Sequence, residues 1–279
     1  MKVSPECYQC LQRLVYQAAE LATEDERLKS LAIAEGLKVV EEQFSYDKLS
    51  ITIATEIHRV IREVTQNSDP YKAMKEEEIR VSRELYSRLR NQYGQDLRGC
   101  LTLSLLGNSI DFFRDIERVR EEMAKPIQFA KDDTDKLEGK LKEAKRILYL
   151  ADNTGEVFFD LPLVKYMEGF ALVIYVVKAS PVQDDVTLED LKEMGLEGEF
   201  SRVITTGTAT PGVDLALASA EFKRELASAD LVLAKGMGYY ESLTELPAEG
   251  KVFYGFMAKC QPVGNSAGVP LSSYVAMLC

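Results

Sequence analysis

Residues 146–156 read RILYLADNTGE, and this stretch decides the fold. Its apolar part, residues 147–151, has no polar interruption, which is typical of a strand buried on both faces of a parallel sheet. The polar run 152–156 follows at once, at the point where such a strand ends and where ligands bind in open α/β sheets. The stretch therefore predicts both a sheet and a site at its edge.

Short apolar runs of the same kind follow along the second half of the chain. They cover residues 171–177, 202–206, 231–234 and 251–256 and are rich in Val, Ile, Leu, Phe and Tyr. Helical patterns separate them, at 157–167 and at 213–227, the latter opened by Thr210 and Pro211. Buried strands that alternate with helices predict a Rossmann-like, three-layer α/β/α domain with a mostly parallel sheet.

The first half of the chain has a different pattern. Apolar residues recur three or four positions apart, with almost no alternation of period two, which indicates helices. The expected helices are at 5–22, 26–44, 50–65, 71–93 and 100–113. We therefore expect an all-helical domain over residues 1–139 and the α/β/α domain over residues 140–279.

The charge excludes one large class of function. The net charge is −11, from 34 basic and 45 acidic residues, whereas nucleic-acid binding depends on Lys and Arg set against phosphates. No apolar run reaches the roughly 18 to 20 residues of a membrane span, and residues 1–10 lack the apolar stretch of a signal peptide. We expect a cytoplasmic protein with neither nucleic acid nor a membrane as its partner.

The chain has a single histidine, His58. Ser/His/Asp, Cys/His and multi-histidine zinc sites all need imidazole, so an enzyme of this composition should use carboxylates and lysines. His58 lies at helical spacing with Ile57 and Ile61, which favours a packed or solvated helix residue over a ligand. The run 76–78, three glutamates, similarly favours a solvated helix face. Tyr239 and Tyr240 could belong to the core, although their position after Gly238 favours a pocket rim.

Five cysteines without a signal peptide favour a reducing compartment over a disulfide framework. Cys7 and Cys10 form a CxxC pair, which is half of a zinc site. Cys100, Cys260 or His58 could complete that site only if the fold brought them together. Packing or capping cysteines are the simpler interpretation, and the sequence leaves both open.

Each predicted strand ends in polar residues or glycines, and the ends of parallel strands share one edge of the sheet. In chain order they supply Asp152 with Asn153, Lys178 with Asp184 and Asp185, Thr205 with Thr206, Lys235 with Gly236, and Lys259 with Cys260. Oxygens of Asp and Asn suit a hard cation such as Mg²⁺ or Mn²⁺, and a lysine across the cleft suits a phosphate. The alternative is that these residues are helix caps, where Asp, Asn and Thr are common.

The residues that follow the predicted strands argue against several common cofactor-binding and catalytic motifs. Neither the GxGxxG dinucleotide motif nor the P-loop motif occurs. The DNTGE turn is not glycine-rich and Lys178, not an acid, ends the second predicted strand, which argues against S-adenosylmethionine. Thr154 stands two positions after Asp152, where haloacid-dehalogenase-like phosphatases have an acid, so a phosphoaspartyl route is disfavoured. A metal-centred site fits best.

Together these motifs resemble the DUF89 family, the ARMT1-like metal-dependent damage-control phosphatases, over nearly the whole chain. The resemblance is carried by DNTGE at 152–156, PVQDDVT at 181–187, KGMGYYESL at 235–243, Lys259-Cys260, Gly107-Asn108 with Asp111, and Asp69-Pro70-Tyr71. Ser4 to Cys7 with Cys10 resembles the archaeal and bacterial branch. The chain has Asp184 and Tyr239 where many members have Asn.

The resemblance implies a helical domain packed over the strand ends and a divalent cation, Mg²⁺, Mn²⁺, Co²⁺ or Ni²⁺, held by Asp152, Asn153 and Asp185. The catalytic residues would be Asp152, Glu156 and Lys235, with Glu156 either supporting a metal ligand or orienting a water. The residues that would bind the substrate are Gly107, Asn108, Asp111, Lys235, Gly236 and Lys259.

Similar proteins hydrolyse small phosphomonoesters, including sugar phosphates and damaged phosphometabolites. We therefore expect a metal-dependent phosphatase whose partner is a small phosphorylated metabolite. Two alternatives remain: a non-catalytic metal- or metabolite-binding module, and a carboxyl methyltransferase, which the absent glycine-rich turn disfavours.

Overall fold

The computed structural model describes residues 1–110, 121, 123, 125, 127–247 and 249–279. In this part of the chain seven strands form one sheet in the order β1-β7-β6-β5-β2-β3-β4, and all neighbours are parallel except β6 and β7. The strands are β1 (Phe129–Asp132), β2 (Arg146–Leu150), β3 (Leu172–Val177), β4 (Val203–Thr205), β5 (Leu231–Lys235), β6 (Val252–Met257) and β7 (Tyr274–Leu278). The predicted α/β class with a mostly parallel sheet is confirmed.

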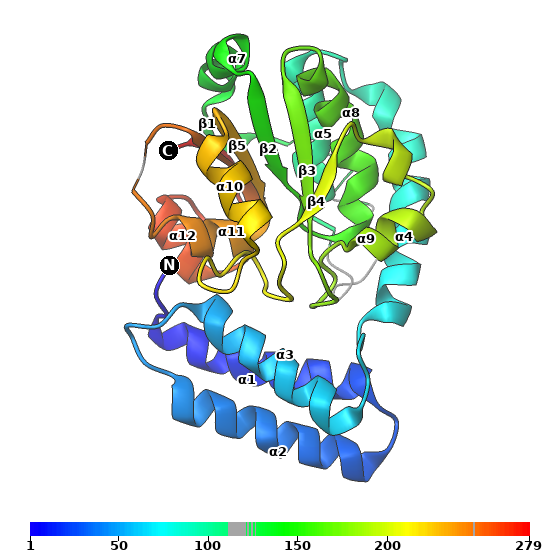
Figure 1. Ribbon diagram of the computed structural model, residues 1–279, viewed down its shortest axis with the longest axis vertical. Coiled ribbons are helices and arrows are strands. Elements are labelled where there is room, and N and C mark those ends of the chain that lie inside the picture. The colour runs from blue at the N-terminus through cyan, green and yellow to red at the C-terminus, as the bar shows by residue number, and fades with distance from the viewer. Residues whose placement is uncertain (111–120, 122, 124, 126, 248) are drawn as a thin grey trace.

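Helices cover the sheet and form a separate layer at one end of it (Figure 1). The α-helices are α1 (Pro5–Ala22), α2 (Glu26–Gln43), α3 (Ser50–Thr65), α4 (Lys72–Leu89), α5 (Leu97–Gly107), α7 (Thr134–Glu143), α8 (Val157–Glu168), α9 (Leu188–Glu193), α10 (Ala220–Ser228), α11 (Gly236–Leu243) and α12 (Gln261–Ala267). Short 3₁₀ helices are η1 (Arg90–Gln92), η2 (Thr154–Glu156) and η3 (Glu197–Glu199). None of the helices in the described part of the chain combines the length and the apolar character needed to cross a membrane.

The alternation of side chains along the strands builds two cores. On β2, Ile147 and Tyr149 face the layer that contains α5 and α8, whereas Leu148 and Leu150 face the layer that contains α10 and α11. Because every second residue of a strand points to the same face, a run of apolar residues serves both cores at once. This explains why the strand segments of the sequence are apolar throughout.

The carboxyl end of β2 is the switch point of the sheet. From β2 the chain runs outward through β3 to β4 and then returns to β5 on the other side of β2. Connections on the two sides of β2 therefore diverge and leave a crevice at its carboxyl end, where ligands bind in open sheets. The DNTGE turn occupies this position.

The helices α1, α2 and α3 pack around a core of their own, whose buried residues lie between Val3 and Tyr71. Figure 1 shows this three-helix bundle across the end of the α/β part, where the yellow and green loops approach it. By contrast, Leu85 of α4 and Leu105 of α5 share a core with Tyr149 of the sheet. The domain boundary between residues 139 and 140 stays a prediction.

Several local expectations differ from the structure. The helix expected at 100–113 begins at Leu97 and ends at Gly107. Residues 129–132, within the part expected to be helical, form β1, a mostly exposed edge strand without an apolar run. The strand β7 was not anticipated either. The helix expected at 213–227 begins only at Ala220, because Ser219 is its N-cap and its hydroxyl accepts from the Phe222 amide at 3.1 Å.

Candidate active site

A cavity of about 190 Å³ lies at the carboxyl end of β2. It is lined by Asn108, Ile110, Asp152, Asn153, Gln183, Asp184, Asp185, Pro211, Gly212, Met237, Gly238 and Lys259. The structure thus places all three predicted metal ligands at one cavity, together with Asn108 and Lys259 from the predicted substrate-binding set. Glu156, Lys235, Gly107 and Gly236 do not line it, and Asp111 lies outside the described residues.

Backbone hydrogen bonds hold the predicted metal ligands next to each other. Asn153 and Asp185 form an isolated antiparallel bridge. The amide of Val186 donates to the Asp152 carbonyl at 2.9 Å, and the amide of Thr154 donates to the Asp184 carbonyl at 2.8 Å. The loop that carries Asp185 is therefore attached along the DNTGE turn as if it were a short extra strand.

The loop at 181–187 is also anchored from the helical side. The Arg62 guanidinium donates to the Pro181 carbonyl at 2.6 Å. The buried ammonium of Lys75 pairs with Asp69 at 2.8 Å and with Asp190 at 3.0 Å, so it connects the start of α4 to the start of α9. The predicted Asp69-Pro70-Tyr71 motif thus acts on the site through Lys75.

Burial and nearby charges raise the pKa of both Asp152 and Asp185. Burial and the charges of Glu156 and Asp185 raise the pKa of Asp152 well above its usual range. Burial also raises the pKa of Asp185, although the ammonium of Lys178 acts in the opposite direction. Two such charges about 4 Å apart repel by about 4 kcal/mol at an effective dielectric near 20. A bound cation would remove this repulsion.

Lys178, directly after β3, was expected at this edge of the sheet but was not assigned a role in the site. Its fully buried ammonium lies 3.2 Å from Asp185 Oδ2, donates to the Tyr239 hydroxyl at 3.0 Å and also donates to the Gly212 carbonyl. Tyr239 is itself fully buried, so it lies behind the wall of the cavity and not at its rim. The signal in the sequence was a lysine directly after a buried strand.

Asn108 connects three elements at the floor of the site. The side-chain oxygen of Asn108, Oδ1, accepts from the backbone amide of Met257, at the end of β6, at 2.9 Å. This bond directs the amide nitrogen toward Asp152 Oδ2 at 3.0 Å and Glu156 Oε1 at 2.8 Å. The predicted Gly107-Asn108 motif therefore reaches the site through Asn108.

Lys235 lies beneath the cavity in a buried ionic network. Its ammonium donates to Asp160 at 2.7 Å, to Glu156 at 2.8 Å and to the Ser104 carbonyl at 3.1 Å. An ammonium has three donors, and these three contacts use them all. In this arrangement Lys235 and Glu156 position each other, and Asp160, one turn along α8, is a partner that the sequence did not single out.

The two predicted glycines serve close packing. A Cβ on Gly107 would lie 2.8 Å from the Phe159 Cβ, so this glycine allows α5 to approach α8. Gly236 has φ +78°, and a Cβ there would lie 1.9 Å from Asp152 Oδ2. Gly236 thus leaves room for the Asp152 carboxylate at the start of α11.

Replacing Gly236 by Ala should displace Asp152 and remove activity. Gly195 provides a matched control, because it has φ +71° and nothing within 4 Å of a Cβ. The left-handed conformation alone costs roughly 1–2 kcal/mol for a residue with a Cβ. We expect Gly195→Ala to lose about this much stability and to keep its activity, whereas Gly236→Ala loses both. Chemical denaturation and turnover measure the two effects, and equal activity in the two variants would contradict this role.

Glu78 corrects the expectation of a solvated face for residues 76–78. Glu76 and Glu77 are exposed, but Glu78 is 1% exposed and accepts from the Gly155 amide at 3.0 Å. Burial and the charge of Asp184 raise its pKa well above the usual range. Its position in the helical stripe formed with Met74, Val81 and Leu85 was the available signal.

His58 and Cys7 make packing and capping contacts in the structure. The zinc-site alternative for the CxxC pair stays a prediction, because Cys260 lies near enough that, besides burial, the charges of this pair raise its pKa. His58 is buried and packs edge-on against Tyr71. The Cys7 thiol accepts from the Ser4 amide at 3.3 Å and so helps to cap α1. Within the described residues, which include all five cysteines, no group of three or more His, Cys, Asp or Glu side chains is arranged to hold a metal ion.

The donor set at the cavity nevertheless fits a hard divalent cation. Asp152 and Asp185 offer carboxylate oxygens and Asn153 offers an amide oxygen, which Mg²⁺ and similar cations prefer. The buried Asp185 Oδ2 is ion-paired with the Lys178 ammonium at 3.2 Å but accepts no hydrogen bond from the described residues. With two carboxylates and one amide, such a cation would retain positions for water or substrate.

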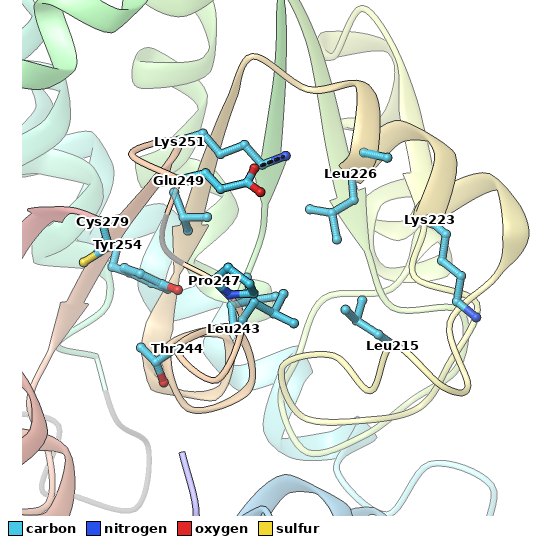
Figure 2. Close-up of a pocket in the computed structure, with 13 residues that line it drawn as sticks. Leu215, Lys223, Leu226, Leu243, Thr244, Pro247, Glu249, Lys251, Tyr254 and Cys279 are labelled. Atoms are coloured by element: carbon cyan, nitrogen blue, oxygen red, sulfur yellow. Dashed lines mark ion pairs between the residues drawn. The ribbon is translucent and has the colours of Figure 1, made fainter.

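A second, more apolar cavity lies at the opposite end of the strands. It has about 540 Å³ and borders Val252, which begins β6, and Cys279 after the end of β7. Figure 2 shows Leu215, Leu226 and Leu243 around it and an ion pair between Glu249 and Lys251 at its edge. Among the described residues that line it, Glu249 has the single side-chain carboxylate, so the cavity at β2 is the better candidate for an active site.

Comparison with known proteins gives the family. The model of the damage-control phosphatase ARMT1-like domain matches residues 3–275. The chain belongs to this family. The resemblance to DUF89 proteins is therefore confirmed, and the motifs quoted from the sequence lie within the matched residues.

Relatives match the chain from end to end. A protein of Methanocaldococcus jannaschii is 34% identical, with 99% of this chain and 95% of the relative covered. Proteins named damage-control phosphatase from Pyrococcus horikoshii and Archaeoglobus fulgidus are each 31% identical, covering 99% of this chain and 98% and 99% of the relative. The crystal structure of a DUF89 protein from Pyrococcus horikoshii is similar with a TM-score of 0.91 at 30% identity, covering 100% of this chain and 99% of that one.

Proposed function

We propose that this chain is a divalent-metal-dependent phosphatase that hydrolyses small phosphomonoesters. The observation that carries the proposal is the arrangement of Asp152, Asn153 and Asp185 with Lys259 around one cavity at the switch point of the sheet. Membership of the family and the names of two relatives support it. The proposed partner is a small phosphorylated metabolite.

The residues would divide the work by position. Asp152, Asn153 and Asp185 would hold the cation, which when bound supplies positive charge to a phosphate oxygen. Lys259, on the wall of the cavity, suits the phosphate as a point charge. Gly238 and Met237, at the start of α11, form the wall beside them.

We assign the residues beneath the cavity to positioning. Glu156 is 1% exposed, and its two oxygens accept from Asn108 and Lys235. Asn108 in turn donates to Asp152. Glu156 and Lys235 therefore fix the orientation of the amide that holds the Asp152 carboxylate. Of the two lysines that the resemblance places near the phosphate, Lys259 would make the contact and Lys235 would not.

Hydrolysis of p-nitrophenyl phosphate by chelator-treated protein tests the proposal. We expect no turnover until Mn²⁺, Co²⁺, Mg²⁺ or Ni²⁺ is added, because the uncompensated carboxylates would repel a phosphate dianion. The same cation should raise the melting temperature, since it binds the folded state preferentially. A cation-dependent rise in melting temperature without turnover of any phosphate ester would instead favour a non-catalytic binding module.

A further inference from the structure

The cavity at β2 is too small for a whole organic phosphate. Its volume is about 190 Å³, whereas pockets for small organic ligands usually have roughly 300–1,000 Å³. A phosphoryl group with a cation and its waters is a ligand of suitable size. The organic part of a phosphomonoester must then lie outside this cavity, in a direction that the walls allow.

Among the described residues, one direction leads from this cavity toward the three-helix bundle. A neighbouring cavity of about 510 Å³ shares Gln183, Pro211, Met237 and Gly238 with the cavity at β2. Its other side is formed by α1 and α3, through Cys10, Leu11, Arg13, Leu14, Gln17, Ser50, Ile51 and Ala54, together with Glu241 of α11. The two cavities therefore meet at the start of α11.

We propose that this neighbouring cavity is the subsite for the organic part of the substrate, and that α1 and α3 determine which phosphomonoester is accepted. The inference rests on the proposed phosphatase function. It assigns to the helical bundle a role in specificity beyond covering the strand ends.

The lining defines the class of group that the subsite accepts. Leu14, Ile51 and Met237 offer apolar contact. Arg13 and Gln17 offer polar contacts from α1, and Glu241 offers a carboxylate that already accepts from the Ser50 hydroxyl. The expected leaving group is an alcohol larger than the phosphoryl group, with a short carbon skeleton and hydrogen-bonding substituents.

Cys10 gives chemical access to this subsite. It is exposed and lines the cavity, whereas Cys7 and Cys100 are buried. Burial raises the pKa of Cys260 to about 11 and also raises that of Cys279. Because Cys10 is exposed whereas the other four cysteines are buried or half-buried, thiol reagents should modify Cys10 first.

The experiment modifies Cys10 with methanethiosulfonate reagents of increasing size, from methyl to benzyl, and measures binding by calorimetry. We expect the affinity for phenylphosphonate, in the presence of Mn²⁺, to fall with reagent size, by about tenfold or more for the benzyl group. The affinity for inorganic phosphate should not change measurably. Cys10→Ser must be insensitive to the reagents, and Gln17→Tyr, which narrows the cavity without a reagent, should reproduce the selective loss.

These binding readouts need no turnover, so the subsite can fail or hold independently of the phosphatase proposal. Equal losses for phenylphosphonate and inorganic phosphate would overturn the subsite, because the label would then act on the centre at β2. Unchanged phenylphosphonate affinity in benzyl-labelled protein would overturn it as well. Absence of phosphate ester hydrolysis by unlabelled protein would overturn the proposed function alone.

Discussion

The Asp152→Asn variant is expected to lose cation-dependent hydrolysis while its metal-free form stays at least as stable as the wild type. Loss of groups that only support metal ligands costs about 10- to 100-fold in affinity or activity, so loss of a ligand should cost at least about a hundredfold. Stability should not fall, because the substitution removes one charge from a buried cluster with Glu156 and Asp185. The amide oxygen of the new side chain can still accept from Asn108.

Turnover and thermal melting of the same preparations check this expectation. The rise in melting temperature that Mn²⁺ produces in the wild type should disappear in Asp152→Asn and in Asp185→Asn. Asp184→Asn is the matched comparison, since the backbone carbonyl of Asp184, which accepts from Thr154, is retained. Equal turnover in all three variants and the wild type would refute the assignment of the metal ligands.

Much of this site could be predicted because its residues follow local rules. A strand buried on both faces is apolar throughout, and the polar residue that ends it lies at a shared edge. These two rules bring Asp152, Asp185 and Lys259 to one cavity although they are far apart in the sequence. The backbone bridge between Asn153 and Asp185 then fixes their spacing.

These rules do not predict which helix the side chain at the end of a strand contacts. Lys235 continues the face of Leu231 and Leu233, so it points into the layer of α5 and α8 and meets Asp160. Lys178 continues the face of Ile174 and Val176, so it points to the opposite layer and meets Tyr239 of α11. The alternation is visible in the sequence, but which helix covers each face depends on the long-range topology.

Two other expectations, for β1 and for Glu78, failed for equally specific reasons. The edge strand β1 has the burial of a loop and no apolar run, so only its pairing with β7 defines it. Glu78 looked like part of a charged run, but α4 packs so closely on the DNTGE turn that a Cβ on Gly155 would lie 2.3 Å from the Ser82 hydroxyl. Contacts of this kind follow from tertiary packing.

Replacement of Lys235 by Met distinguishes a positioning role from a role in phosphate binding. The variant leaves Glu156 and Asp160, 1% and 0% exposed, without their shared cation. Removal of one partner from a buried ion pair typically destabilises a protein by about 3–5 kcal/mol. Lys142→Met is the matched control. Lys142 pairs with Glu138 at 2.9 Å, but its side chain is 62% exposed, and surface ion pairs contribute about 0–1 kcal/mol to stability.

Urea unfolding of metal-free protein measures both variants without any contribution from a substrate. The double variant Lys235→Met with Asp160→Asn should recover part of the lost stability, because it removes one of the two uncompensated charges, and a double-mutant cycle gives the coupling. Its activity should stay low, since Glu156 still lacks the ammonium that orients it. A Lys235→Met protein of wild-type stability with only a raised KM would mean instead that Lys235 leaves this network to bind the phosphate.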